Sequence, residues 1–394
     1  MFNTISLFTG LGGLDYGFEA AGFKTRAAIE IDNRCCDTLR TNTKWTIFEE
    51  DAKYLHTSQV LDSIGYSKGD IDVLLGGSPC QPFSKSGYWV TGDTKRLKDP
   101  RAKTLSIFMK YIEDILPCIF VIENVHGISY NEKKEGYLLI EKKIKSINRK
   151  KGVNYQFSWA ILNAANYGVP QTRVRFFLIA HRDGEKFAFP PRTHFDHKVE
   201  NKNEDNVNDK KSYVTAWDAI GDIKGKNDGD LTVKGKWANL LPSIPEGKNY
   251  LWHTNRDGGL PLFGWRTRYW SFLLKLAKNR PSWTIQAQPG PATGPFHWKN
   301  RLLSVDEMIA LQTLPKNLKI VGNRTEVQKQ IGNAVPSLLA EIIARKIASQ
   351  FFNKKNKNRL KFEVALKRPI PLPESIEPAK KKYHYLIGDH PDHP

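Results

Sequence analysis

A cysteine lies between two prolines within residues 76–84, which read Gly-Gly-Ser-Pro-Cys-Gln-Pro-Phe-Ser. Thiolates are the most nucleophilic groups that a protein offers, so Cys80 could attack an electrophilic carbon. The apolar run 71–75 precedes this segment and predicts a buried strand. A turn of small residues after such a strand would hold the thiol at the mouth of a sheet. From these residues alone, a nucleophile and a packing cysteine both stay open.

Charged side chains accompany two further predicted strands. Glu123 follows the apolar run 118–122, and Arg173 and Arg175 lead into the apolar run 176–180. A carboxylate at the C-terminal edge of a parallel sheet lies where such folds place their chemistry. The two arginines, at positions i and i+2, would point to the same side of a strand. We therefore treat these three side chains as candidate site residues.

A glycine turn lies near the start of the chain. A strand expected at residues 4–8 runs into Thr-Gly-Leu-Gly-Gly at residues 9–13, and residues 14–21 predict a helix. Strand, glycine turn and helix are typical of the start of a nucleotide-binding α/β unit. The third glycine of the dinucleotide pattern is out of register. A pyrophosphate is therefore not required, and an adenosine without phosphates would fit.

Acidic residues follow the next two expected strands. Glu30 and Asp32 end the strand at 25–29, about twenty residues after the glycine turn, where an acid commonly holds ribose hydroxyls. Asp51 follows a third expected strand. It could face the same ligand, or it could be an acid of a surface loop.

The composition indicates a globular protein that binds a polyanion. The chain has 394 residues, of which 40% are hydrophobic, and this length fits one large domain with an insertion or two domains. Its net charge of +19 is typical of nucleic-acid binding, although solubility alone could account for the excess. The four cysteines match neither a disulfide framework nor a zinc pattern, which favours a reducing compartment. We expect neither a signal peptide nor a membrane span.

The second half of the chain changes character. Residues 198–211 are polar and predict a linker, and residues 234–298 are crowded with glycines, aromatic residues and arginines. We expect the second segment to form loops or a small sheet that contacts bases and phosphates, with a small aromatic core as the alternative. The pair His194 and His197 has no third ligand nearby in the sequence, so we expect no metal there.

Helical patterns return near the C-terminus. Ser304 or Asp306 would cap one helix, and residues 330–336 would open a last helix that runs to about Phe351. The final residues, 353–394, are rich in Lys and Asn and then in Pro. They predict a poorly ordered basic tail that adds non-specific affinity for nucleic acid.

Five motifs in this order resemble the DNA (cytosine-5) methyltransferases. They are Phe8-Thr9-Gly10-Leu11-Gly12-Gly13, Pro79-Cys80-Gln81-Pro82-Phe83-Ser84, Glu123-Asn124-Val125, Gln171-x-Arg173-x-Arg175 and Gly332-Asn333-Ala334-Val335-Pro336. The resemblance covers about residues 3–350. It implies an α/β fold, a doubly wound mixed sheet of the S-adenosylmethionine-dependent methyltransferase type, with a smaller irregular target-recognition domain. On this basis we expect a catalytic and cofactor-binding domain at 1–185, completed by 325–352, then a target-recognition domain at 186–324 and a flexible tail at 353–394.

The resemblance also implies a cofactor, S-adenosylmethionine, and no metal. Glu30 would then hold the ribose, Ile31 would pack on the adenine ring, and Asp51 would bind the adenine amine. Asn333 would close the site from the last helix. The methionine and adenosine would contact the turn residues Phe8, Gly10, Leu11, Gly12 and Gly13.

The catalytic residues follow from the same resemblance. The target cytosine would be flipped out of the duplex. Cys80 would add to C6 of the ring, Glu123 would hold N3, and Arg175 would hold O2. Arg173 would support the Glu123 carboxylate or a phosphate. The product would be 5-methylcytosine.

Residues that read or hold double-stranded DNA are less well specified by the sequence. Arg256, Arg266 and Arg268 are candidates to read guanines in the major groove. Lys85 and Ser86 are candidates for the gap that the flipped base leaves. Arg101 is a further candidate DNA contact, in a polar loop at residues 81–103 that could act as a lid.

The resemblance favours a bacterial, cytoplasmic, monomeric enzyme. It would modify a short DNA sequence beside a restriction endonuclease, without a stable complex and without contact to a membrane. Two other functions stay open: a cytosine-5 methyltransferase that acts on transfer RNA, and a catalytically silent DNA-binding regulator. The sequence lacks the Cys-Phe-Thr element of the first, and its Cys80, Glu123 and Arg175 speak against the second.

Overall fold

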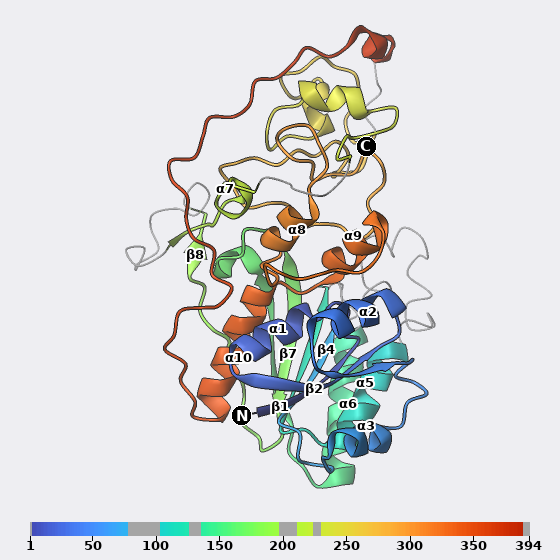
Figure 1. The fold of residues 1–394 in the computed structure, drawn as a ribbon, viewed down its shortest axis with the longest axis vertical. Coiled ribbons are helices and arrows are strands. Elements are labelled where there is room, and N and C mark those ends of the chain that lie inside the picture. The colour runs from blue at the N-terminus through green and yellow to red at the C-terminus, as the bar shows by residue number, and fades with distance from the viewer. Residues whose placement is uncertain (1, 78–102, 126–134, 197–210, 224–229, 389–394) are drawn as a thin grey trace.

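The architecture is that of a computed structural model of the chain, which describes residues 2–77, 103–125, 135–196, 211–223 and 230–388 (Figure 1). A sheet flanked by helices fills the lower half of the molecule in this view, and irregular chain fills the upper half. No helix in the described ranges is both long enough and apolar enough to cross a membrane.

Seven strands within the described ranges form one sheet, in the order β3-β2-β1-β4-β5-β7-β6. Neighbouring strands are parallel, except that β7 runs antiparallel to both β5 and β6. The strand order reverses between β1 and β4, which is where doubly wound sheets bind their ligands. The expected doubly wound mixed sheet is therefore confirmed. The strands are β1 (Phe2–Leu7), β2 (Phe23–Glu30), β3 (Thr46–Glu49), β4 (Val73–Gly77), β5 (Ile119–Val125), β6 (Gln156–Asn163) and β7 (Val174–His181).

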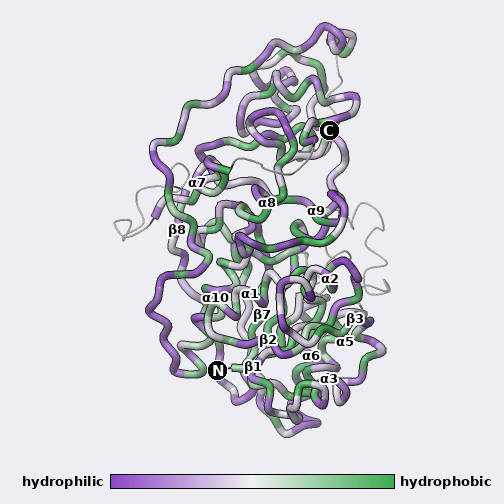
Figure 2. Tube along the Cα trace, in the orientation of Figure 1, coloured by the Kyte–Doolittle hydropathy of each residue, from purple (hydrophilic) through white to green (hydrophobic). Residues whose placement is uncertain are grey.

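Helices cover both faces of this sheet because successive strand residues point to opposite sides. Val73 and Leu75 of β4 pack in one core with α1 and α10, whereas Leu74 packs in a second core with α3, α5 and α6. Figure 2 shows hydrophobic residues concentrated in the strands and the helices against them. The helices of this half are α1 (Gly13–Ala20), α2 (Asn33–Asn42), α3 (Thr57–Ile64), α5 (Lys103–Ile115), α6 (Glu135–Lys151) and α10 (Ser337–Phe351).

The C-terminal helix α10 lies directly against the first helix, α1. A Cβ atom placed on Gly17 would lie 2.4 Å from Cβ of Ala340, and one on Gly13 would lie 2.4 Å from the carbonyl oxygen of Val335. Ser337 Oγ donates to the Gly13 carbonyl at 2.9 Å. Only glycine permits this close approach. The chain end therefore packs against the N-terminal half.

The expected last helix is divided into two. Helix α9 (Arg324–Asn333) begins at the cap Asn323 and ends before Pro336, and α10 starts after that proline. A proline cannot continue a hydrogen-bonded helix, which explains the break. Residues 330–336 therefore end α9 and join it to α10; they do not open a single helix. Ser304, the first of the two proposed caps, begins α8 (Val305–Leu311) in a capping box with Glu307.

Irregular chain forms the upper half, which we call the upper lobe (residues 230–275). Its core contains Leu240, Tyr250, Phe263 and Phe272, so part of the aromatic content serves packing. Its turns are η7 (Ala238–Ser243) and η8 (Tyr250–His253). The remaining short elements are η5 (Ala164–Tyr167), β8 (His194–Phe195), β9 (Lys211–Ser212), α7 (Ala216–Ile220) and η9 (Lys381–Leu386).

Residues beyond the upper lobe return to the first core. Leu276, Ile285, Trp298 and Met308 pack in the same cluster as α1 and α10. Helices α8 and α9 lie between the sheet and the upper lobe (Figure 1). This part of the expected recognition domain at 186–324 thus shares a core with α1 and α10, and the expected domain bounds stay a prediction.

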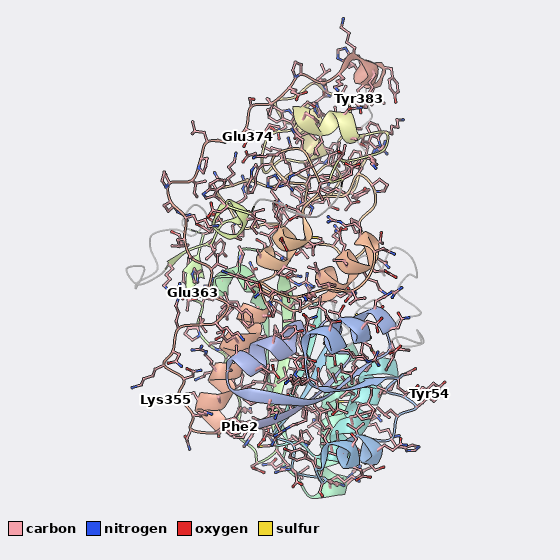
Figure 3. The ribbon with its side chains drawn as sticks, in the orientation of Figure 1. Phe2, Tyr54, Lys355, Glu363, Glu374 and Tyr383 are labelled. Atoms are coloured by element: carbon pink, nitrogen blue, oxygen red, sulfur yellow. The ribbon has the colours of Figure 1, made fainter. Side chains whose placement is uncertain are left out.

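The C-terminal tail differs from the sequence prediction. Residues 353–388, which we call the C-terminal strap, run from the end of α10 along one side of the molecule to the upper lobe (Figures 1 and 3). Phe362 and Tyr383 of the strap are buried. Part of its positive charge is paired with acidic side chains, since Arg359 bonds Glu363 of the strap at 2.6 Å and Lys367 contacts Asp222 at 3.0 Å. The strap is therefore a packed segment and not a loose basic extension.

A buried acid lies beneath the glycine turn. Asp15 of α1 is completely buried and accepts a hydrogen bond from Ser6 Oγ at 3.1 Å. Burial raises the pKa of this carboxyl to about 7, and the bond from Ser6 offsets only part of the effect. The folded protein therefore holds a proton on Asp15 that the unfolded chain releases near its ordinary pKa of 3.8.

Replacement of Asp15 by Asn should stabilise the protein more at pH 8 than at pH 5. Because the folded-state pKa is raised, the wild-type protein loses stability as the pH rises from about 4 to about 7. The shift predicts that the Asp15→Asn variant gains on the order of 2 kcal/mol more at pH 8 than at pH 5. Denaturant unfolding at both pH values measures this, with exposed Asp62→Asn as the control. An equal effect at both pH values would contradict the prediction.

Candidate active site

The carboxyl ends of β1, β4 and β5 meet at one edge of the sheet. Gly77, the last residue of β4, pairs with Glu123 of β5. A Cβ atom on Gly77 would lie 3.6 Å from Glu123 Oε2 and 3.8 Å from the carbonyl oxygen of Phe8. Cys80 follows Gly77 by three residues in the sequence. The candidates Cys80, Lys85, Ser86 and Arg101 lie outside the described residues.

Glu123 and Arg175 form a buried ion pair at this edge. Arg175 Nε lies 3.0 Å from Glu123 Oε1, and the two side chains are 14% and 7% exposed. The antiparallel pairing of β5 with β7 brings the start of β7 to the end of β5. Burial raises the pKa of the Glu123 carboxyl, while Arg175 and, to a smaller extent, Arg173 oppose that shift. The pair can thus hold a proton on Glu123 beside a fixed cation.

Arg173 is held in the interior by backbone carbonyls. It lies one residue before β7, is 1% exposed, and donates to the Gly332 carbonyl at 2.7 Å and the Ile285 carbonyl at 3.5 Å. Such burial argues against the suggested phosphate contact. The positive charge still acts on Glu123, but the hydrogen bonds fasten the end of α9 to the start of β7.

The glycine turn and Glu30 form one hydrogen-bonded unit. Glu30 Oε2 accepts from the Gly10 amide at 2.7 Å, and Oε1 accepts from the amides of Ile31 and Asp32 at 2.9 and 2.8 Å. Gly10 and Gly12 have positive φ angles, of 58° and 88°, which glycine adopts readily. Three of about four acceptor positions on the carboxylate are therefore filled, and one is left for a ligand hydroxyl.

The other cofactor candidates surround this unit. Ile31 is 67% exposed, which is unusual for an isoleucine and leaves an apolar face for a flat ring. Asp51 is half-buried and Oδ1 accepts from the Lys53 amide at 2.9 Å. Asn333 is exposed at the last position of α9, so it approaches from that helix and not from α10. Leu11 is buried, and Phe8 has a φ angle of 56°.

Two buried glutamines bond to each other behind the site, and no sequence pattern had indicated this contact. Gln171 Nε2 donates to Gln312 Oε1 at 3.3 Å, and Gln312 Nε2 donates to the Ile331 carbonyl at 2.7 Å. Both are 0% exposed. A separation of 141 residues explains why local sequence patterns could not reveal their contact.

An ion pair between α9 and the start of α2 was also not predicted from the sequence. Lys329 of α9 bonds Asp32 at 2.6 Å, and Asp32 in turn caps α2 through the amides of Arg34 and Cys35. Burial of Asp32 raises the pKa of this carboxyl, but the bond from Lys329 and the two amides outweigh burial and hold the pKa below its usual value. The glycine turn is thereby linked to α9 through Glu30 and Asp32.

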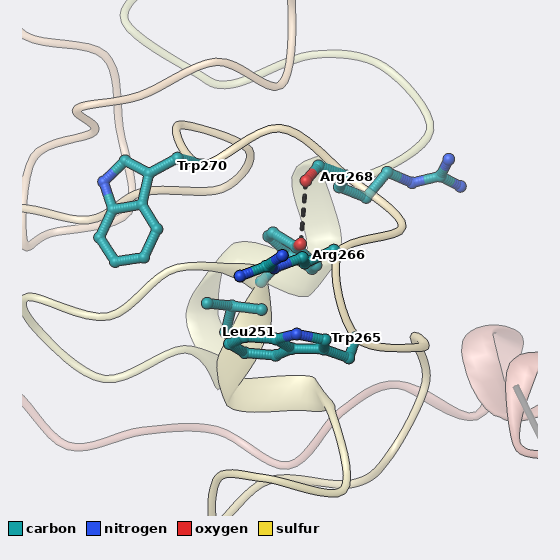
Figure 4. Close-up of a pocket in the computed structure, with 6 residues that line it drawn as sticks. Leu251, Trp265, Arg266, Arg268 and Trp270 are labelled. Atoms are coloured by element: carbon teal, nitrogen blue, oxygen red, sulfur yellow. Dashed lines mark hydrogen bonds between the residues drawn. The ribbon is translucent and has the colours of Figure 1, made fainter. Parts of the chain in front are cut away.

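The three arginines proposed for base reading are exposed on the upper lobe. The guanidinium of Arg256 lies 4.4 Å from the ring centre of Trp265, and that of Arg266 lies 5.6 Å from it. Arg268 lies 5.7 Å from the ring centre of Trp237, and the hydroxyl of Tyr250 donates to its carbonyl at 2.9 Å (Figure 4). A hollow of about 320 Å³ opens here, lined by Tyr250, Leu251, Trp265, Arg266, Arg268 and Trp270.

Three possible metal ligands also lie together at the opposite end of β5. Ligand atoms of Cys118, His181 and Asp183 lie within 4.8 Å of one another. The His181 ring stacks on Phe351 at 4.4 Å, and burial raises the pKa of the Cys118 thiol to about 11. This cluster belongs to the far edge of the sheet from Glu123, so it takes no part in the site. The expectation of a metal-free protein stays a prediction, as does that for His194 and His197.

The chain is similar to named DNA methyltransferases over most of its length. It is 36% identical over 369 residues to the type II methyltransferase M.SacI of Streptomyces achromogenes, which covers 88% of this chain and 92% of that protein. It is 32% identical over 337 residues to M.NgoFVII of Neisseria gonorrhoeae, covering 84% and 82%. The fold matches a DNMT2 mutant of Spodoptera frugiperda with a TM-score of 0.59 at 15% identity, covering 86% of this chain and 98% of that one.

The model of the C-5 cytosine-specific DNA methylase family matches residues 2–349. This range includes the sheet, the Glu123–Arg175 pair, the glycine turn and both C-terminal helices. The chain therefore belongs to the C-5 cytosine-specific DNA methylases and is a DNA cytosine methyltransferase.

Proposed function

We propose that the protein methylates C5 of cytosine within one short sequence of double-stranded DNA, with S-adenosylmethionine as the methyl donor. The observation that carries this proposal is the buried Glu123–Arg175 pair, at the edge of the sheet where the strand before Cys80 ends. A carboxyl that can hold a proton beside a guanidinium matches N3 and O2 of cytosine, which need a donor at each position.

The residues at the glycine turn fit the proposed donor. The exposed side chain of Ile31 offers an apolar face for adenine, and Glu30 keeps one acceptor position for a ribose hydroxyl. A Cβ atom on Gly10 would meet no described atom within 4 Å, so space is open above the turn. Asp51 and Asn333 would also contact the methyl donor. S-adenosylmethionine would supply an electrophilic methyl group there.

The proposed chemistry uses Cys80, Glu123 and Arg175. The sulfur of Cys80 forms a bond to C6 while Glu123 gives its proton to N3, so that electron density moves to C5. Arg175 stabilises the charge that develops at O2. C5 would then take the methyl group, and the donor would leave as its neutral thioether. Loss of the C5 proton to a base and cleavage of the sulfur–C6 bond would restore the aromatic ring. N3 returns its proton to Glu123.

The target cytosine would be flipped out of the duplex before this reaction. Extrusion costs a few kcal/mol of stacking and pairing. Exposed arginines and aromatic side chains of the upper lobe would hold the surrounding DNA. The protein would act as a monomer in the bacterial cytoplasm. It would protect DNA from a restriction endonuclease with which it forms no stable complex.

Bisulfite sequencing tests this function directly. The gene is expressed in a host without cytosine methylation, and the host DNA is then sequenced after conversion. We expect protected cytosines in one short motif. Cys80→Ala should abolish protection while cofactor affinity, measured by calorimetry, stays nearly unchanged. Cys118→Ala, a thiol at the other end of β5, serves as the control. Soluble protein that binds cofactor but protects no DNA cytosine would refute the proposal.

Glu123→Gln should lower kcat by about 10² to 10⁴, because the amide keeps its shape but cannot transfer a proton. The raised pKa of Glu123 means that its protonated fraction falls as the pH rises through that value. The wild-type rate should therefore fall on the alkaline side, and this limb should vanish in the variant. Surface Glu185→Gln is the control. A variant with wild-type kcat would exclude proton transfer by Glu123.

Arg266→Ala and Arg268→Ala should each weaken binding to the target duplex by about 1 to 3 kcal/mol and relax the preference at one base pair. Binding is measured by titration at several salt concentrations, with duplexes that differ at single positions. Arg149→Ala removes an exposed arginine of α6 as the control. If an arginine binds only phosphate, all sequences weaken equally and the salt slope falls by about 1. That outcome would contradict base reading.

A further inference from the structure

The C-terminal strap is first anchored on α10. Glu341, which is 0% exposed, accepts from the amides of Lys361 and Phe362 at 2.9 and 3.2 Å. The same carboxylate bonds Arg345 at 2.6 Å, and Arg345 also donates to the Arg359 carbonyl at 2.9 Å. The strap thus supplies two of the hydrogen bonds to the buried Glu341 carboxylate, whose charge would be costly without partners.

A second anchor lies on α7. Asp218 is 1% exposed and uses its two oxygens differently. Oδ2 accepts from Thr215 in the cap of α7, whereas Oδ1 accepts from the Lys367 amide at 2.6 Å and pairs with Arg368. The strap and the start of α7 therefore share one buried acid.

The third anchor joins the strap to the base of the upper lobe. Lys278, 3% exposed, bonds Glu246 at 2.6 Å and Glu374 of the strap at 2.9 Å. It also donates to the Leu372 carbonyl at 3.0 Å, and the Glu374 amide donates to Glu246 at 2.8 Å. Glu363, Glu374 and Tyr383 mark the course of the strap in Figure 3.

The end of the strap enters the core of the upper lobe. Tyr383 is 2% exposed, stacks on Trp237 with ring centres 5.9 Å apart, and donates to the Lys236 carbonyl at 2.8 Å. The other neighbours of Trp237 are Phe263 at 5.4 Å and Phe272 at 5.6 Å. The guanidinium of Arg268 lies within 5.8 Å of the ring centres of Trp237, Phe263 and Phe272.

We propose that the C-terminal strap positions the DNA-reading surface, with Tyr383 as the positioning residue that fixes the aromatic wall beneath Arg268. The inference rests on the proposed role of Arg268 in DNA binding. The Arg268 side chain is long and exposed, so binding DNA would cost it conformational freedom. Fixed aromatic rings beneath it already restrict that freedom, and less is then lost on binding. The earlier anchors tie that wall to α10 and thereby to the catalytic half.

Four variants test the inference: Tyr383→Ala, Tyr383→Phe, Tyr383→Leu and, as a matched control, Tyr385→Ala. Tyr385 lies two residues away in the same turn and is 66% exposed. Tyr383→Ala should raise the KM for target DNA about tenfold, which equals about 1.4 kcal/mol, with little change in kcat. Hydrogen exchange should accelerate in residues 262–273 of the free protein, while cofactor affinity stays at the wild-type value.

The other variants keep the test decisive. Tyr383→Phe retains the stacked ring, so its KM should equal that of the wild type. Tyr383→Leu retains buried apolar volume, so it reports on the wall even if Tyr383→Ala does not fold, and it should also raise the KM. An unchanged KM and unchanged exchange in Tyr383→Leu, or an equal effect of Tyr385→Ala, would overturn the inference.

Failure of the proposed function gives a different result. If Arg268→Ala binds target DNA as tightly as the wild type, the role of Arg268 is wrong. Exchange in residues 262–273 still measures whether Tyr383 fixes the wall, because it needs no DNA. If Arg268→Ala weakens binding but the Tyr383 variants change neither KM nor exchange, the strap inference alone fails.

Discussion

The burial of one carboxyl beside one guanidinium is the constraint on which the catalytic edge depends. The Glu123 side chain is 7% exposed, so its carboxylate charge would be costly at this depth without the guanidinium of Arg175 beside it. The antiparallel strand β7 resolves this requirement. A sheet that continued in parallel would place the start of β7 at the opposite edge, whereas reversal brings Arg175 opposite Val125, two residues past Glu123. The mixed topology therefore creates the ion pair as well as the sheet.

A second constraint comes from the far end of the chain. The glycine turn and Glu30 are bonded to each other, but the walls beyond them are supplied by α9 and α10. Gly13 and Gly17 let α10 lie against α1, and Arg173, Gln171 and Gln312 bond the end of α9 to the segment before β7. The result is that residues more than 300 positions apart in sequence line one edge of the sheet.

Much of this arrangement could be predicted from the sequence because it depends on local signals. Apolar runs predicted the strands, the glycines predicted the turn after β1, and the position of Glu123 at a strand end predicted its place at the carboxyl edge. The ordered motifs added the family. Ser304 was correctly proposed as a cap because a side-chain oxygen three residues before a glutamate is a short-range pattern.

The predictions that failed depended on contacts that composition does not encode. A tail rich in Lys, Asn and Pro suggests disorder, yet the partners of this strap are buried acids contributed by three distant segments, at Glu341, Asp218 and Glu246. Spacing likewise placed Arg173 and Arg175 on one face of a strand; only Arg175 belongs to that strand, although both charges act on Glu123. In each case the partner of the charge is remote in the sequence. The Glu123–Arg175 pair and the strap thus follow the same rule: a buried acid is stabilised by a distant cation or backbone amide that the fold brings to it.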